Sequence, residues 1–259
     1  MSIQFDKVQP KTKEQLKQLI NYAFKHDIYD LNFIDTSKIT DMSWLFDNVN
    51  HNFDISSWDV SNAKDMSYMF QFCYDLNCDL SSWDVSNVTN MKYMFACCEK
   101  FNCDLSNWNV SNVTNMSHMF FYCENFDINC FKSWDVSNVE NTSYMFYNCK
   151  NFNCDLSKWD TSIVKDMHSM FARCEKFNCD LSYWDVSNVT DMYSMFAFCN
   201  KFNCDLSNWD VSNVTNMYFM FGHCKQFNCD LSHWNTSKVK DMTDMFTCCN
   251  RLTIPNWYK

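Results

Sequence analysis

Cysteine is the residue type in this chain with the widest range of possible chemical roles, and the cysteines are regularly spaced. The 259 residues include 17 cysteines, most of which fall 15 or 20 residues after successive tryptophans. Such thiols can be small buried apolar groups, disulfide partners or zinc ligands. An odd total and no sign of an oxidising compartment favour buried free thiols, with the other two uses left open. The two cysteine columns are Cys73, Cys98, Cys123, Cys149, Cys174, Cys199, Cys224 and Cys249, and Cys78, Cys103, Cys154, Cys179, Cys204 and Cys229.

Aspartates form a further regular row in a segment with strand-like alternation. Carboxylate oxygens are the ligands that Ca²⁺ prefers, so the row is a candidate calcium site. Solvent and neighbouring Asn and Ser donors can equally compensate for like charges about 5 Å apart. The absence of glycine-rich calcium loops favours a solvated row and predicts no bound metal or cofactor. The row contains Asp54, Asp79, Asp104, Asp155, Asp180, Asp205 and Asp230.

Catalytic signatures are missing from the chain. The six histidines fall at scattered repeat positions, and no Gly-x-Ser-x-Gly or paired-histidine metal motif is present. Gly222 is the single glycine, which excludes both glycine-rich nucleotide-binding fingerprints. A net charge of -10 disfavours nucleic acid, and no stretch is apolar enough to predict a membrane span. We therefore expect a protein that is not an enzyme.

A tandem repeat organises these residues. Eight tryptophans follow one another at intervals of 25 residues, with one interval of 26, and Ile34 takes the place of Trp in an earlier copy. A representative unit runs from Trp83 to Asn107. Nine copies of this length predict coils that stack and share one core. The tryptophans are Trp58, Trp83, Trp108, Trp134, Trp159, Trp184, Trp209 and Trp234.

Each unit combines two hydrophobic periods. Val88, Met91, Phe95 and Cys98 recur at steps of three and four, which predicts a short helix begun by the serine three residues after each Trp. The alternation around Cys103–Val110 predicts short strands, with corners built by Asn, Asp and Ser. The expected fold class is an α/β repeat solenoid resembling a leucine-rich repeat, and the alternative is a β-solenoid with helical corners.

The two ends differ from the repeats. Residues 1–33 contain a helical pattern in which Leu16, Leu19, Ile20 and Phe24 share one face, and this predicts an N-terminal helical cap. Residues 34–250 hold the nine repeats, and residues 251–259 form a C-terminal cap. A one-residue insertion at Asp127–Phe131 is typical of a bulge. We expect a single domain.

Aromatic residues occupy the positions that vary between copies. Varying positions on the outer face of a repeat protein are where partner-specific contacts reside, although such side chains can also pack across neighbouring coils. We expect a protein partner to bind this varying face. The candidate residues are Tyr68, Phe72, Tyr93, Phe121, Tyr122, Tyr144, Tyr147, Phe198, Tyr218 and Phe219.

The repeat resembles a known family. Its Met-Phe-x-x-Cys-x-x-Phe run is similar to the Ala-Phe-x-x-Cys-x-x-Leu signature of BspA-like leucine-rich repeats, and the Trp-Asp-Val-Ser-Asn-Val-Thr block resembles the tryptophan-bearing branch of that family. The similarity runs from Ile34 to about Asn250. It implies a leucine-rich-repeat-like fold and adhesion or partner binding at the cell surface. The start of the chain lacks a secretory signal or lipid-attachment cysteine and many cysteines are present, which favours the cytoplasm instead.

Two functions follow from these observations. The first is a protein-interaction scaffold or adhesin-like module that binds through its varying outer face. The second is a structural or cation-dependent surface protein that holds calcium on the aspartate row.

Overall fold

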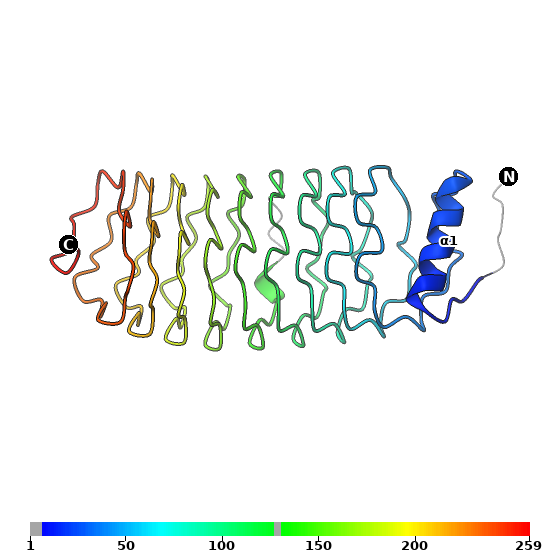
Figure 1. Ribbon diagram of the computed structural model, residues 1–259, viewed down its shortest axis with the longest axis horizontal. Coiled ribbons are helices and arrows are strands. Elements are labelled where there is room, and N and C mark those ends of the chain that lie inside the picture. The colour runs from blue at the N-terminus through cyan, green and yellow to red at the C-terminus, as the bar shows by residue number, and fades with distance from the viewer. Residues whose placement is uncertain (1–6, 127–130) are drawn as a thin grey trace.

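The repeat region winds into a stack of coils, one for each copy of the repeat. The computed structural model describes residues 7–126 and 131–259. The coils follow one another along the long axis of the molecule, with the helix α1 at one end and the C-terminus at the other (Figure 1). Parallel bridges join the same position in successive coils, as in Asp65 to Asn90 and Asn90 to Asn115. The repeat in the sequence is therefore the unit of the stack.

The expected secondary structure of the repeats is wrong. Across residues 7–126 and 131–259 the only helices are α1, Lys13–Lys25, and the 3-10 helix η1, Phe131–Ser133. The same residues form isolated parallel bridges but no continuous β-strand. Neither the α/β solenoid of short helices and strands nor the β-solenoid with helical corners describes this molecule. The cysteine segment still alternates between buried and exposed residues as predicted, but without strand pairing.

Consecutive turns replace the predicted helix. Tyr93 and Cys97, four residues apart, have φ of 56° and 61°, which is the left-handed region. The amides of Met94 and Cys98 donate to carbonyls three residues earlier, at 3.2 and 3.1 Å, and close two turns. A left-handed residue every four positions prevents a right-handed helix. We call the two positions the first and second turn columns: Trp44, Tyr68, Tyr93, His118, Tyr144, Ser169, Ser194, Phe219 and Asp244, and Asn48, Phe72, Cys97, Tyr122, Asn148, Arg173, Phe198, His223 and Cys248.

Hydrogen bonds between coils explain why turns are preferred to a helix. The amide of Met91 donates to the Asn115 carbonyl at 3.0 Å and that of Tyr93 to Ser117 at 3.0 Å, and the amides of Phe95 and Cys97 continue this ladder. Such ladders hold chains about 4.8 Å apart, whereas packed helices need about 8–10 Å. The coils follow the closer spacing, since stacked core phenylalanines such as Phe70 and Phe95 have ring centroids 5.6 Å apart. A helix in every coil does not fit this spacing.

The core consists of side-chain columns that run through the stack. Each repeat Trp is buried and donates its indole N–H to a carbonyl of the preceding coil, as in Trp108 Nε1 to Leu80 O at 3.0 Å. Trp257 lies in the predicted C-terminal cap, yet it continues this column by donating to Leu231 O at 2.8 Å and stacking on Trp234. The tryptophan geometry therefore extends beyond the eight regularly spaced copies.

Aspartate and asparagine side chains build the corners of the coils. The amide of Ser61 donates to Asp59 Oδ1 at 3.0 Å, and the same turn recurs in later repeats. The repeat serine was expected to begin a helix, but no helix follows it and its amide is a donor in this turn. The next residue links coils, as Asn87 Nδ2 donates to Ser61 O at 2.8 Å. Because Asp and Asn side chains close these turns, the chain forms its corners with a single glycine.

Helix α1 covers the first coil. Thr12 caps its first turn, and Leu16, Ile20 and Ala23 are its buried residues. Lys13 Nζ lies 2.9 Å from Asp41 Oδ1, which places the start of the helix over the first coil. The predicted N-terminal helix is therefore present.

The insertion does not disturb the register of its flanking coils. Residues 127–130, on which the predicted bulge falls, lie outside the described residues. Trp134, which follows η1, donates its indole N–H to Leu105 O at 3.1 Å as the other column members do. The parallel bridge from Asn115 to Asn141 still joins equivalent repeat positions, although the segment between them is one residue longer than in the other repeats.

Candidate interaction surface

A row of ring contacts crosses six successive coils on the surface formed by the two turn columns, which we call the turn face. Centroid separations are 3.9 Å for Trp44–Tyr68, 4.8 Å for Tyr68–Tyr93 and 4.0 Å for Tyr93–His118. His118–Tyr144 and Tyr144–His168 follow at 4.5 and 4.7 Å. One coil contributes one ring, so the side chains touch because the coils stack. We name this row the aromatic strip: Trp44, Tyr68, Tyr93, His118, Tyr144 and His168.

The second turn column adds a cluster beside the strip. Phe121 lies 4.7 Å from Tyr122 and 5.1 Å from Tyr147 between ring centroids, and Tyr122 lies 5.5 Å from Tyr147. Phe121 also contacts Tyr144 of the strip at 6.0 Å. The predicted candidates Phe121, Tyr122, Tyr144 and Tyr147 thus lie together at the centre of the turn face.

The remaining predicted residues occupy the same face at some distance from this cluster. Tyr68 and Tyr93 belong to the strip. Phe72 has Tyr74 as its ring neighbour at 6.4 Å, and Phe198 stacks on His223 at 4.6 Å. Tyr218 and Phe219 lie two coils beyond His168 and contact each other at 6.1 Å.

Several residues of the face escaped the sequence analysis. The histidines were interpreted as scattered, yet His118 lies ten residues after Trp108 and His223 fourteen residues after Trp209, the same spacings as the predicted aromatics. Counting every residue from the preceding Trp was the signal that could have found them. The missed residues are Trp44, His118, His168, Arg173 and His223.

Turn geometry does not require aromatic residues in these columns. Ser169, Ser194 and Asp244 adopt the left-handed conformation in the first column, and Asn48 and Asn148 do so in the second. Asn and Asp enter this region at lower cost than bulky residues. The copies of the repeat therefore act as controls for one another, and they show that small polar residues make the same turns.

Neighbouring positions compensate where the first column carries a small residue. His168 and Tyr193 precede Ser169 and Ser194, and the ring of Tyr193 stacks on Tyr218 at 5.3 Å. At Phe219 the ring covers Gly222, where a Cβ atom would lie only 2.5 Å from the ring. The single glycine thus provides room for an aromatic side chain on this face.

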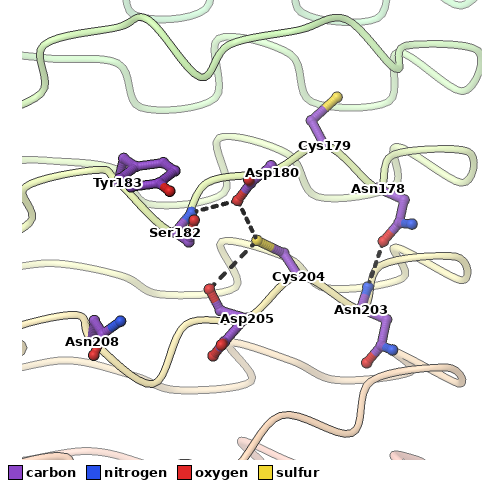
Figure 2. A pocket seen from close by; sticks show the side chains of 9 residues that line it. All are labelled: Asn178, Cys179, Asp180, Ser182, Tyr183, Asn203, Cys204, Asp205 and Asn208. Atoms are coloured by element: carbon purple, nitrogen blue, oxygen red, sulfur yellow. Dashed lines mark hydrogen bonds between the residues drawn. The ribbon is translucent and has the colours of Figure 1, made fainter.

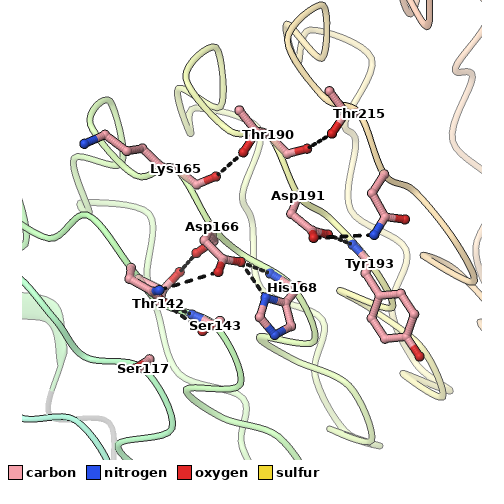
Figure 3. A network of polar contacts seen from close by, with 12 residues as sticks. Ser117, Thr142, Ser143, Lys165, Asp166, His168, Thr190, Asp191, Tyr193 and Thr215 are labelled. Atoms are coloured by element: carbon pink, nitrogen blue, oxygen red, sulfur yellow. Dashed lines mark hydrogen bonds and ion pairs between the residues drawn. The ribbon is translucent and has the colours of Figure 1, made fainter. Parts of the chain in front are cut away.

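The two histidines of the strip have opposite electrostatic environments. Burial lowers the pKa of His118 to about 4, with the charges of Lys92 and His168 adding to the effect. Its Nδ1 atom has no hydrogen-bond partner among the described residues. Burial also lowers the pKa of His168, but the hydrogen bond to Asp166 at 2.6 Å and its charge outweigh burial, so the pKa is raised (Figure 3). At neutral pH the centre of the strip is uncharged.

The aspartate row of the calcium hypothesis uses its oxygens within the chain. Asp180 Oδ1 accepts from the amide of Ser182 at 2.9 Å and from Cys204 Sγ at 3.7 Å (Figure 2). In the next coil Asp205 Oδ1 accepts from the amide of Ser207 at 2.9 Å. The hydrogen bonds from Ser182 hold the pKa of Asp180 below its usual range. In the described part of the chain, no group of three His, Cys, Asp or Glu side chains is placed to hold a metal ion.

The first cysteine column is part of the core. Cys98 Sγ donates to Phe70 O at 3.0 Å, and Cys123 Sγ donates to Phe95 O at the same distance. All eight members are free thiols. Burial raises the pKa of Cys73 to about 12 and that of Cys98 well above the usual value, so these thiols stay protonated. They are not nucleophiles at neutral pH.

Comparison with known proteins gives one family. The sequence model of a family described as "Mycoplasma protein of unknown function, DUF285" matches residues 14–132, 120–208 and 180–257. No curated protein and no solved structure matches the chain. No helix in residues 7–126 and 131–259 has the length and apolar character needed to cross a membrane. Three overlapping matches to one model are consistent with a repeat family.

Proposed function

We propose that this chain, which belongs to the DUF285 family whose model matches it three times along its length, is a non-enzymatic protein-interaction scaffold that binds through its turn face. Ring contacts and backbone hydrogen bonds between successive coils order the side chains of that face, so a partner meets a surface that is already organised. The resemblance to BspA-like repeats supports an adhesin-like role for the same face.

The observation that carries the proposal is the presence of exposed aromatic residues in the second turn column. Phe72 and Tyr122 are each 37% exposed and have φ of 58° and 60°. Asn48 and Asn148 make the same turn without an aromatic ring. A bulky residue in the left-handed region costs about 1–2 kcal/mol, so the aromatic choice is not explained by the turn.

Packing within the chain does not offset this cost equally in the two columns. Tyr93 in the strip stacks on a ring at either side, and each such pair contributes about 0.5–1.5 kcal/mol. Among residues 7–126 and 131–259 Phe72 has one ring neighbour, tilted and 6.4 Å away, so it recovers little. Folding therefore accounts for the strip, whereas an external contact accounts better for the aromatic residue at Phe72 in the second column. Aromatic side chains at a rigid surface are typical anchors of protein interfaces.

A site-specific crosslinking experiment tests the proposal. A photoreactive phenylalanine analogue is placed at Tyr122 or, as the matched control, at Tyr183, which is 83% exposed and lies outside the two turn columns beside Ser182 (Figure 2). The chain is expressed in the cells that produce it naturally and irradiated. We expect a discrete adduct with a second protein at Tyr122 and none at Tyr183.

A second variant separates binding from folding. The substitutions Phe72→Asn, Tyr122→Asn and Phe198→Asn together introduce the residue that the column itself uses at Asn48 and Asn148. Because Tyr122→Asn and Phe198→Asn also remove ring contacts within the chain, the variant should still unfold cooperatively but at a lower melting temperature, and, with the probe moved to Tyr147, it should lose the adduct. Equal adducts at Tyr122 and Tyr183, or an adduct that survives the triple substitution, would overturn the proposal.

A further inference from the structure

Arg173 is an exposed cation on the turn face of an acidic protein. The chain has 21 Lys and Arg against 31 Asp and Glu, and Arg251 is its only other arginine. The Arg173 guanidinium lies over the Phe198 ring, 4.9 Å from the centroid. Phe198 in turn stacks on His223 at 4.6 Å. The second turn column thus presents a guanidinium fixed by aromatic packing.

No acid in the described chain neutralises this cation. None of the ion pairs among the described residues includes Arg173. Glu124, two coils away near Tyr122, accepts from Asn148 Nδ2 at 2.7 Å and from Lys150 Nζ at 2.8 Å. Both oxygens of Glu124 therefore already have donors, and Arg173, which is in no ion pair among the described residues, retains its capacity for a carboxylate from outside the chain.

We propose that Arg173, with Phe198 next to it in the second turn column and Tyr122 two coils away on the other side of Asn148, binds an aspartate or glutamate side chain of a protein segment whose neighbouring apolar side chains lie on the two rings. This inference rests on the proposed function and names the chemistry of its partner. A guanidinium binds a carboxylate through two parallel hydrogen bonds, and adjacent rings exclude the water that would weaken them.

The charge of the surroundings favours a carboxylate over a phosphate. Proteins that recognise phosphorylated segments use clusters of arginines, and Arg173 is the only arginine on the turn face. The net charge of -10 repels a dianion more strongly than a single carboxylate. One unpaired cation among aromatic residues therefore fixes the position and orientation of a single acidic side chain.

Selection from a displayed library of random peptides provides the probe. The full-length chain is immobilised, and the peptides it retains are compared with those retained by the triple Asn variant. We expect the parent to enrich peptides in which Asp or Glu lies beside aromatic or aliphatic residues. An enriched peptide and its counterpart with Gln or Asn are then synthesised, and their affinities are measured by fluorescence anisotropy.

The expected preference for the acidic peptide is about 10- to 100-fold, the usual range for a hydrogen bond to a charged group. Arg173→Gln should abolish this preference, and Arg173→Lys should retain part of it as a point charge. Arg251→Gln, the matched control at the other arginine, should leave it unchanged. All variants should remain folded, and Arg173→Gln should melt slightly below the parent because it loses the contact with the Phe198 ring.

The outcomes separate this inference from the proposed function. Enriched peptides without acids, or an acidic preference that survives Arg173→Gln, overturn the role of Arg173 while the turn face remains a binding surface if the triple Asn variant loses the peptides. Equal retention by the parent and the triple Asn variant, or no retention by either, overturns both.

Discussion

The tryptophan column and the aromatic strip are both stacks of rings, but different interactions determine which residue types each position accepts. Tryptophan rings in adjacent coils lie 6.5 Å apart at Trp83–Trp108 and 6.2 Å apart at Trp159–Trp184, are buried, and donate to a carbonyl of the coil before. The strip has closer rings and a more exposed surface, and its members differ between coils. An indole hydrogen bond to the backbone restricts a position to Trp, whereas ring stacking alone accepts Trp, Tyr or His.

Removing a tryptophan should have the largest effect on stability. Trp159→Ala deletes a buried ring and one of the two donors to the Phe131 carbonyl, whose other donor is the amide of Trp134, and we expect a loss of about 3–5 kcal/mol in the free energy of unfolding. Urea denaturation followed by circular dichroism measures it. Trp159→Phe retains a ring but not the donor and should lose about 1–3 kcal/mol. If the alanine variant were as stable as the parent, the column would not be a core element.

Removing a ring from the strip should cost less. Tyr93→Ser eliminates contacts with Tyr68 and His118 and should lower the free energy of unfolding by about 1–3 kcal/mol, the sum of two ring pairs. Serine is a fair replacement because Ser169 makes the same turn. Tyr183→Ser, at an exposed aromatic outside the strip, should change stability by less than about 0.5 kcal/mol. Equal losses in the two variants would contradict stacking as the source of the effect.

Acidification should weaken the centre of the strip. The pKa of His118 is about 4 in the fold against 6.5 for an ordinary histidine, so its contribution to stability is complete above pH 6.5 and is lost as the pH falls toward 4. The raised pKa of His168 has the opposite linkage: its contribution is complete below pH 6.5 and is lost above that pH as its folded-state pKa is passed. His168 therefore adds no change on the acidic side.

A melting series compares the parent with His118→Tyr, the residue type of its column neighbours. The parent should lose melting temperature between pH 6.5 and pH 4, and the variant should lose distinctly less. Parallel curves for the two proteins would mean that protonation of His118 does not oppose folding.

The smallest effect is expected in the second turn column. Phe72→Asn removes a ring with one distant neighbour and relieves a bulky left-handed residue, so stability should change by less than about 0.5 kcal/mol. Chemical denaturation of the single variant checks this. A loss comparable to that of Tyr93→Ser would place Phe72 in the packing of the stack and remove the main argument for a binding role.

The sequence predicted which side chains of each repeat are buried, but not the backbone conformation that buries them. Trp83, Val88 and Phe95 are core residues as their recurrence indicated, because side-chain burial follows the spacing of apolar residues. Steps of three and four also arise from consecutive turns of four residues, so spacing alone could not exclude a helix. The deciding factor was the distance between coils, which depends on hydrogen bonds between residues far apart in sequence, such as Tyr93 and Ser117.

The candidate site was predicted in part, because residue spacing identifies positions on a face but not contacts between residues far apart in sequence. Aromatics at varying positions identified most of the turn face, and the N-terminal helix was found from its apolar pattern. Among the described residues Arg173 is in no ion pair, and this depends on where the acidic side chains of neighbouring coils lie, which sequence spacing does not reveal.

The direction of the ladder between coils gives the stack an electrical polarity. In each interior coil four turn amides donate toward the C-terminal neighbour, as Tyr93 does, whereas one to three amides, such as that of Thr114, donate back toward the N-terminal neighbour. Because these peptide dipoles do not cancel, the end with outward carbonyls carries a partial negative charge, as at the C-terminus of a helix. That end is where α1 places Lys13 and Lys17, so the basic side chains of the helix complement the field of the coils beneath it.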